Sequence, residues 1–159
     1  MSFVSDLKVW EDAQKEFAKV LMDKTKVIGL EFAQGKFKDW DIKANIIPEG
    51  ITTYEVKTDL KASETNNFVI EYRYKWKASW IFSSKADYIV YYIKWQRRIQ
   101  DRWELILRLM DTEKRDTKGW DGFFSSLWVI SCDNLPNLFN LIENGQTEQS
   151  NSDSASSVS

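Results

Sequence analysis

Acidic and basic residues gather in one stretch of the chain, 39–59, which reads DWDIKANIIPEGITTYEVKTD. A central turn divides it into two strand-like segments, and the second segment carries Glu55 and Lys57. Because side chains alternate along a strand, these two residues lie on one face. An acid from the first segment, Asp39 or Asp41, can join them at the end of the hairpin. Two carboxylates and an amine form a set that can bind a hard divalent cation and catalyse hydrolysis.

An acid two residues before a lysine is by itself a weak signal. About one Glu-x-Lys tripeptide is expected by chance in every other chain of this size. Tripeptides of this kind, including those that begin with aspartate, occur among other places at Asp6, Asp41, Glu55 and Asp116. Among these, only Glu55 lies in a β-prone run that follows another acid-bearing strand. Residue types alone still favour the plain alternative, a solvated strand of alternating charge.

The composition excludes several kinds of catalytic site. The 159 residues contain no histidine and a single cysteine, Cys132. Histidine-dependent nucleophiles, histidine general bases, the usual zinc sites and an internal disulfide are therefore excluded. Any catalysis must rest on carboxylates, lysine, hydroxyl groups and a cation such as Mg²⁺ or Mn²⁺. The single cysteine, the lack of membrane-length apolar runs and the lack of a signal-like N-terminus predict a cytoplasmic protein without membrane contact.

The charge is unevenly distributed along the chain. The formal net charge of −2 does not by itself favour a nucleic-acid partner. Basic residues are nevertheless concentrated in the middle, at Lys36, Lys38, Lys43, Lys57, Lys61, Arg73, Lys75, Lys77 and Lys85. This distribution permits binding to a polyanion and is equally typical of a solvated surface of mixed charge.

The pattern of apolar residues predicts a helix followed by a sheet. Apolar residues at spacings of three and four predict an amphipathic helix from 5 to 26. A short helical turn is expected at 83–87, and a closing helix at 135–143 with proline in its first turn. Runs rich in β-branched and aromatic residues predict strands at 27–34, 37–47, 51–57, 68–76, 88–95 and 127–131.

The remaining segments are less regular. Residues 61–67 are polar and predict a loop, while 96–118 fit a helix or a strand. After Gly145 the chain has almost nothing apolar to bury, so 146–159 is expected to be a disordered polar tail. Residues 1–145 are expected to form a single α/β or α+β domain, in which helices pack on a sheet.

The segment WDIKANIIPEGITTYEVKTD resembles the PD-(D/E)xK nuclease superfamily, in which an acid on one strand is followed by Glu-x-Lys on the next. The likeness continues through Thr65-x-Asn67, Glu71 and KASWIFSSKADYIVYY, which are similar to a phage-associated branch. It covers about 37–93, and GWDGFFSSLWVISCDNL is a weaker continuation. Together these segments are far more specific than Glu-x-Lys alone. The chain departs from the family in lacking the proline before the first acid and in carrying Trp80 where a glycine is usual.

The resemblance implies a restriction-endonuclease-like α/β fold, with a central mixed sheet flanked by helices in a single domain. It favours Asp41 over Asp39 as the first metal ligand, because Trp-Asp-Ile matches the family's aromatic-Asp-aliphatic pattern. Glu55 and the Val56 carbonyl would complete the protein ligands of Mg²⁺ or Mn²⁺. Lys57 would act beside the attacking water or the phosphate.

Further residues are weaker candidates. Glu16 resembles a catalytic helical glutamate of many superfamily members, although an exposed helix charge is the simpler interpretation. Glu71 is either another ligand or the ion-pair partner of Arg73 or Lys75. Side chains suited to phosphate contacts, and equally to loop hydrogen bonds, are Lys61, Thr65, Asn67, Ser79, Ser84 and Lys85. Aromatic side chains suited to stacking on unpaired bases, although such residues in strands are more often core, are Tyr74, Trp76 and Trp80.

These features predict a Mg²⁺-dependent deoxyribonuclease of a phage or mobile element, acting on DNA in the host cytoplasm. The alternatives are a catalytically inactive module of the same fold that binds nucleic acid or protein, and a structural protein with an aromatic oligomer face. The set of Asp41, Glu55 and Lys57 favours the enzyme, because a pure binder has no need for acids that repel phosphate. The residues leave open the choice between endonuclease, exonuclease and junction resolvase, the choice between DNA and RNA, and a possible homodimer.

Overall fold

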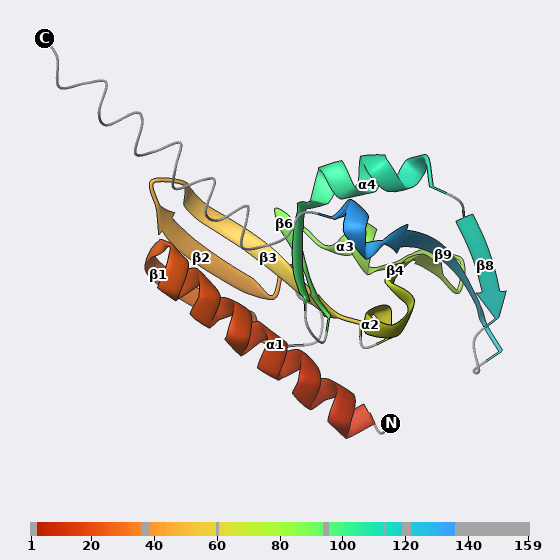
Figure 1. The fold of residues 1–159 in the computed structure, drawn as a ribbon, viewed down its shortest axis with the longest axis horizontal. Coiled ribbons are helices and arrows are strands. Elements are labelled where there is room, and N and C mark those ends of the chain that lie inside the picture. The colour runs from red at the N-terminus through yellow and green to blue at the C-terminus, as the bar shows by residue number, and fades with distance from the viewer. Residues whose placement is uncertain are drawn as a thin grey trace, which may run out of the picture.

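The computed structural model describes residues 3–35, 39–59, 61–93, 96–112, 114–118 and 122–135. These residues form two β-sheets and several helices (Figure 1). The α/β class and the mixed sheet expected from the sequence are confirmed, and a second sheet is present in addition. The restriction-endonuclease-like arrangement stays a prediction.

A mixed sheet of five strands has the order β1-β2-β3-β6-β7. Neighbouring strands pair antiparallel except for β3 and β6, which are parallel. A parallel pair needs a crossover connection, which residues 59–87 supply. The strands of this first sheet are β1 (Lys26–Phe32), β2 (Ile42–Ile47), β3 (Gly50–Thr58), β6 (Tyr88–Ile93) and β7 (Gln96–Asp101).

The second sheet is antiparallel and has the order β5-β4-β9-β8. The strand expected at 68–76 in the central sheet is β4, which instead pairs with β9 in this second sheet. Alternating apolar residues indicate that a strand has a buried face, but they do not identify the sheet that it joins. The strands are β4 (Asn67–Tyr74), β5 (Lys77–Ala78), β8 (Lys114–Lys118) and β9 (Phe124–Ser131).

Helix α1 (Phe3–Lys24) covers one face of the first sheet. Its apolar stripe, which includes Ala13, Phe17 and Leu21, is buried with side chains of β2, β3 and β6. The rings of Phe17 and Tyr54 meet edge to face, with their centroids 5.0 Å apart. The amphipathic helix expected near the N-terminus is therefore confirmed, with bounds slightly closer to the N-terminus.

The other face of the first sheet packs against the second sheet and α4 (Arg102–Met110). Ile89 and Tyr91 of β6 share a buried cluster with Phe68 of β4 and Leu105 of α4. The first sheet is therefore a middle layer between α1 and the second sheet. Figure 1 shows α1 alongside β1 to β3, with β8 and β9 of the second sheet at the opposite end of the molecule.

Two local elements differ from the sequence expectations. The helical turn expected at 83–87 lies earlier, as α3 (Trp80–Ser83), because Ser84 adopts an extended conformation that ends the helix. Residues 96–118 divide into β7, α4 and β8, so neither a single helix nor a single strand describes them. The Asp101 side chain accepts a hydrogen bond from the Glu104 N–H and so caps α4 at the point where β7 ends.

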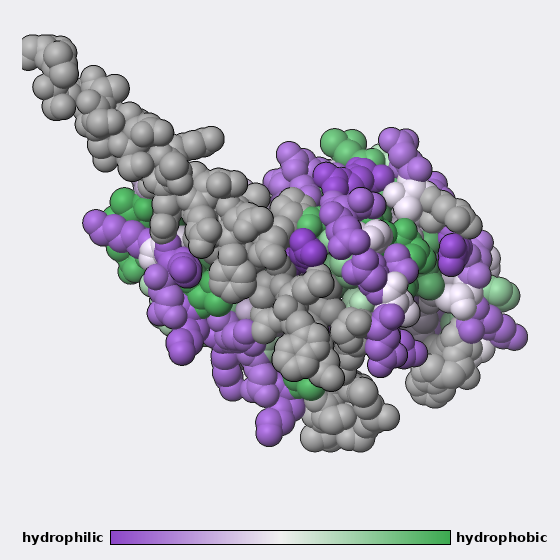
Figure 2. All heavy atoms as spheres, in the orientation of Figure 1, coloured by the Kyte–Doolittle hydropathy of each residue, from purple (hydrophilic) through white to green (hydrophobic). Residues whose placement is uncertain are grey.

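The segment expected as a loop at 61–67 contains the short helix α2 (Ala62–Thr65), and a 3₁₀ turn follows β9 at Cys132–Asn134. Nearly all of the helix expected at 135–143, and all of the tail expected at 146–159, lie outside the described residues. No described helix combines the length and apolar character needed to cross a bilayer. The coloured atoms of the face seen in Figure 2 are mainly hydrophilic, and the apolar ones among them form separate patches, one of them over α4.

Phe17→Ala is expected to lower the free energy of unfolding by about 3–5 kcal/mol, because it leaves a cavity between α1 and β3. Phe17 is fully buried, whereas Leu7 on the same helix is 42% exposed, so Leu7→Ala is the matched control. Urea denaturation followed by circular dichroism measures both changes. A loss for Phe17→Ala no larger than for Leu7→Ala would contradict the packing of α1 on the sheet.

Candidate active site

The beginning of β2 brings Asp41 beside β3. Ile42, the first residue of β2, pairs with Tyr54, so Asp41, one residue earlier, lies next to β3 just outside the paired strand. The Asp41 N–H donates to the Tyr54 carbonyl at 2.8 Å, and Asp41 Oδ2 accepts from the Val56 N–H at 2.7 Å. The carboxylate thus takes the place of the backbone partner that a longer β2 would supply. Asp41 is 1% exposed and lies close enough to Glu55 to influence its ionisation.

Glu55 shares a strand face with Lys57, as the alternation of side chains predicts. Tyr54 and Val56 are buried with α1, so Glu55 and Lys57 point to the opposite side of the sheet. Glu55 Oε1 lies 2.5 Å from Lys57 Nζ, and Oε2 lies 3.2 Å from the Ser84 hydroxyl. Both carboxylate oxygens therefore have a polar partner, and one of these contacts is an ion pair.

Burial raises the pKa of Glu55 above its ordinary value. Its exposed fraction is 7%, and removal from water disfavours the charged carboxylate. Lys57 and Ser84 lower the pKa, and the negative charge of Asp41 raises it, but burial is the largest influence. The site thus contains a carboxyl group whose ionisation costs the folded protein free energy.

Lys57 lies between an acid and an aromatic ring. Its Nζ is 4.5 Å from the centre of the Trp80 ring while it contacts Glu55. The side chain is 28% exposed, so the ammonium group retains access to solvent. Trp80 begins α3 and packs against the buried cluster between the two sheets. The tryptophan at the position where the resembled family has glycine therefore covers one side of the lysine.

The Val56 carbonyl, expected as a metal ligand, accepts a hydrogen bond from the Trp10 indole N–H at 3.0 Å. A carbonyl oxygen has two lone pairs, so it has capacity for a further contact. The hydrogen bond ties α1 to the strand that carries Glu55 and Lys57. Helical periodicity places Trp10 on the packed face of α1, but it gives no sign that the indole reaches this carbonyl.

The carboxylate of Asp39, the alternative first acid, forms an ion pair with Lys85. One carboxylate oxygen lies 2.9 Å from Lys85 Nζ, and both side chains are largely exposed. The Lys85 N–H donates to the Asp39 carbonyl at 2.7 Å, and Ser84 Oγ lies 3.2 Å from the same carbonyl. Since Ser84 Oγ also lies next to Glu55, the single hydroxyl proton can be donated to either oxygen. The structure therefore brings Asp41, and not Asp39, to Glu55.

Glu16 is not brought to this cluster. It lies on the exposed side of α1, and α1 packs on the face of the sheet opposite Glu55 and Lys57. The expected phosphate-contacting residues are divided between places: Ser84 and Lys85 lie at the site, and Lys61 is exposed beside α2. The Asn67 side-chain amide donates a hydrogen bond to the Thr65 carbonyl at 2.8 Å and so stabilises the turn before β4.

The Glu71 carboxylate is held by two hydroxyl groups. Its Oε1 accepts from Ser79 at 2.7 Å, and its Oε2 accepts from Ser125 at 2.8 Å. No sequence pattern pairs these serines with Glu71, because Ser125 is far along the chain and approaches only through the pairing of β4 with β9. The carboxylate therefore links parts of the second sheet.

Asp41 and Glu55 are the carboxylates of this site that could hold a metal ion. Among residues 3–35, 39–59, 61–93, 96–112, 114–118 and 122–135, no group of three or more His, Cys, Asp or Glu side chains is arranged to hold a metal ion. Mg²⁺ is usually held by one or two carboxylates together with waters and substrate phosphates. Asp41 and Glu55 can supply such a partial set, which a phosphate would complete.

Comparison of the chain with protein-family models, with curated proteins and with solved structures found no match. The likeness to PD-(D/E)xK nucleases therefore stays a prediction that depends on the segments around Asp41 and Glu55.

Glu55→Gln is expected to raise the melting temperature near neutral pH, and the gain is expected to shrink as the pH falls towards about 4. The pKa of Glu55 is raised in the folded protein, so the folded state binds this proton more tightly than the unfolded chain does. Above the ordinary pKa range of glutamate, the ionised side chain therefore costs stability, and the amide removes that cost. Thermal unfolding across a pH series, in buffer containing EDTA, measures the difference.

Glu64→Gln is the control, because Glu64 is exposed on α2. Its effect on the melting temperature is expected to be small across the pH series. A difference between Glu55→Gln and the wild type that stays constant from neutral to acidic pH would contradict a raised pKa for Glu55.

Proposed function

We propose that this chain is a Mg²⁺-dependent deoxyribonuclease of a phage or mobile element, which hydrolyses the phosphodiester bonds of DNA. The observation that carries the proposal is the meeting of Asp41, Glu55 and Lys57 where β2 begins beside β3. These polar groups lie among apolar clusters on both sides of the sheet. Burying neighbouring acids costs free energy, and perturbed carboxyl groups of this kind are typical of active sites.

Asp41 and Glu55 would hold the ion, with the Val56 carbonyl as a third oxygen. When bound, Mg²⁺ neutralises charge that develops on the phosphate and lowers the pKa of a water molecule. Burial disfavours the ionised form of Glu55, so a cation at this position would offset that cost. The carboxylate pair would thus be both the binding site of the ion and the group that the ion stabilises.

Lys57 would contact the phosphate or the attacking water. Its Nζ is positioned by Glu55 and by the Trp80 ring, and part of its side chain is open to solvent. As a compact charge with several donors, it can bind a phosphate oxygen, and in its neutral form it can accept the proton of the water. Ser84 and Lys85, which lie at the site, are proposed to contact the DNA backbone there, and Lys61 and Asn67 are proposed to contact it near α2.

An inactive module that binds nucleic acid or protein is the second candidate. The ion pair between Lys57 and Glu55 favours it, because Lys57 has to exchange this partner, at least in part, before it contacts a phosphate. Asp41 is almost completely buried and already serves the backbone of Val56. A module of this kind would bind DNA and leave it intact, so cleavage separates the two candidates.

Glu55→Gln and Lys57→Met are each expected to reduce Mg²⁺-dependent nicking of supercoiled plasmid by roughly a hundredfold or more, because each removes a group acting at the reacting phosphate. Glutamine keeps the shape of the acid, and methionine keeps the apolar stem of the lysine under Trp80. Gel electrophoresis of the plasmid with Mg²⁺, and with EDTA in its place, measures the activity.

The matched controls are Glu31→Gln and Lys19→Met, which change exposed residues of the same types on β1 and α1. Both are expected to cleave at the rate of the wild type. Undiminished nicking by Glu55→Gln, or wild-type protein that binds plasmid and never cleaves it, would rule out the proposed hydrolysis at this site.

A further inference from the structure

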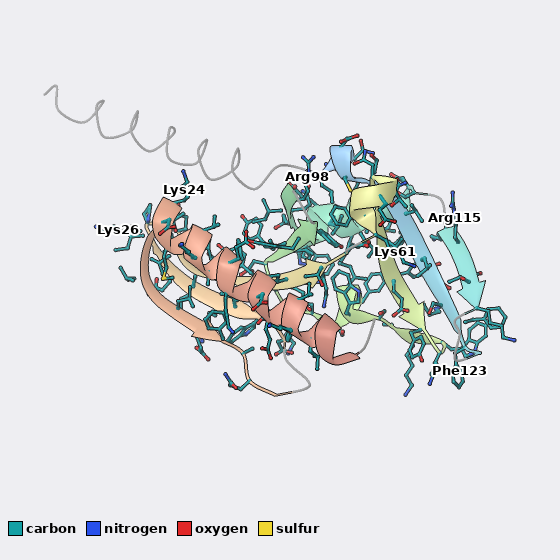
Figure 3. All side chains as sticks on the ribbon, turned by 60° about the horizontal axis from the view of Figure 1, so that its bottom comes forward. Lys24, Lys26, Lys61, Arg98, Arg115 and Phe123 are labelled. Carbon is teal, nitrogen blue, oxygen red and sulfur yellow. The ribbon has the colours of Figure 1, made fainter. Side chains whose placement is uncertain are left out.

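The second sheet ends in an exposed group of aromatic residues, here called the tip. The tip consists of residues 73–78, which are the end of β4, the turn and β5, and of residues 122–124, where β9 begins. Trp76 is 79% exposed, Phe123 46% and Phe124 53%. Figure 3 shows Phe123 at the end of the second sheet, far from Lys61 at α2. Neighbouring exposed aromatic residues of this size mark an interaction surface.

The turn that displays Trp76 has a backbone that its residues do not favour. Lys75 and Trp76 both have positive φ, 48° and 65°. They connect Tyr74 to Lys77, which pair across the hairpin. Two-residue turns of this kind favour Asn-Gly, because other residues in the left-handed region cost free energy. A lysine and a tryptophan at these positions therefore indicate a role for their side chains other than forming the turn.

Contacts at the base of the tip fix its shape. Lys75 Nζ lies 3.7 Å from the centre of the Phe123 ring and 5.0 Å from that of Tyr74. The Tyr74 and Phe123 rings meet edge to face at 6.4 Å, and the Lys75 N–H donates to the Phe124 carbonyl at 3.3 Å. The backbone of the turn is therefore positioned before any ligand arrives, which lowers the entropic cost of binding.

Basic residues surround the aromatic ones, although the whole chain has a net charge of −2. Exposed basic residues of the tip, and of the end of β8 that pairs with Phe124, are Arg73, Lys75, Lys77 and Lys118. Of the acids on the adjoining strands, Glu71 accepts hydrogen bonds from two serines, and Asp116 accepts from Ser126 at 2.5 Å. Aromatic rings set among lysines match single-stranded nucleic acid, because bases stack on the rings and phosphates contact the lysines.

We propose that the tip binds unpaired nucleotides of single-stranded nucleic acid, with Trp76 stacking on a base. Trp76 and Trp80 are four residues apart, so at most roughly 14 Å separates the Cα atom of Trp76 from that of Trp80, whose ring lies over Lys57. A strand held at the tip would therefore lie within a few nucleotides of the candidate active site. The choice of DNA as the natural ligand rests on the proposed function, whereas binding at the tip does not.

Trp76→Asn is expected to weaken binding of a fluorescein-labelled oligo-dT about 5- to 150-fold, which corresponds to the loss of one stacked base. Asparagine tolerates the left-handed backbone, so the turn keeps its shape. Fluorescence anisotropy in EDTA measures affinity without cleavage. Trp103→Asn is the control, because Trp103 is 62% exposed in the first turn of α4, and it is expected to leave the affinity unchanged.

Two further measurements identify the ligand and the contact. The wild type is expected to prefer oligo-dT to a blunt duplex of equal length, and Trp76→Asn to lose that preference. Lys77→Met is expected to reduce the slope of log affinity against log salt by about 0.7, the value for one phosphate contact on a single strand. Binding of oligo-dT is measured in EDTA and cleavage in Mg²⁺, so binding at the tip and cleavage at the acid pair can fail separately.

An affinity for oligo-dT that Trp76→Asn leaves within about twofold of the wild type would overturn the proposal. If Trp76→Asn lost as much affinity for the duplex as for oligo-dT, the proposal would also be overturned, because stacking needs unpaired bases. Wild-type protein that binds neither nucleic acid would exclude this ligand and leave a protein as the partner of the exposed rings.

Discussion

The Glu55 carboxylate is buried on a strand between two apolar layers, so its charge has to be balanced within the protein. Lys57 supplies an ion pair and Ser84 a hydroxyl group, while Asp41 adds repulsion. The balance is incomplete, because burial keeps the pKa of Glu55 raised. The Trp80 ring covers one side of Lys57 and limits its movement. Further neutralisation of the Glu55 charge therefore has to come from a bound cation or a proton.

The place where β2 begins decides which groups can reach Glu55. Before Ile42 no strand of the described residues pairs with this edge of β3, and the Asp41 side chain accepts a hydrogen bond from the Val56 N–H. The indole of Trp10 takes the carbonyl of the same residue, which fixes α1 against this edge. An unpaired strand edge is costly when buried, and here side chains satisfy it. The hydrogen bond from the Val56 N–H also holds the Asp41 carboxylate close to Glu55.

The groups proposed for cleavage and those proposed for binding unpaired bases lie on different sheets. The first sheet carries Glu55 and Lys57, with Asp41 just before β2, between α1 and the second sheet. The second sheet carries exposed rings on a short hairpin, where a ligand can reach them. Trp80 lies between these regions in the sequence and contacts both Lys57 and the core between the sheets. Substrate held by one sheet would thus be presented to groups on the other.

The sequence by itself determined that Glu55 and Lys57 share a face, that α1 has a buried stripe, and that the chain combines helices with a sheet. Each of these follows from periodicity among neighbouring residues, which local backbone geometry dictates. Only the tertiary structure decided that β4 joins a second sheet, that Ser84 and Trp80 reach β3, and that Asp41 rather than Asp39 lies by Glu55. Such contacts depend on strand register and on packing between distant segments, which the pattern of a single chain does not specify.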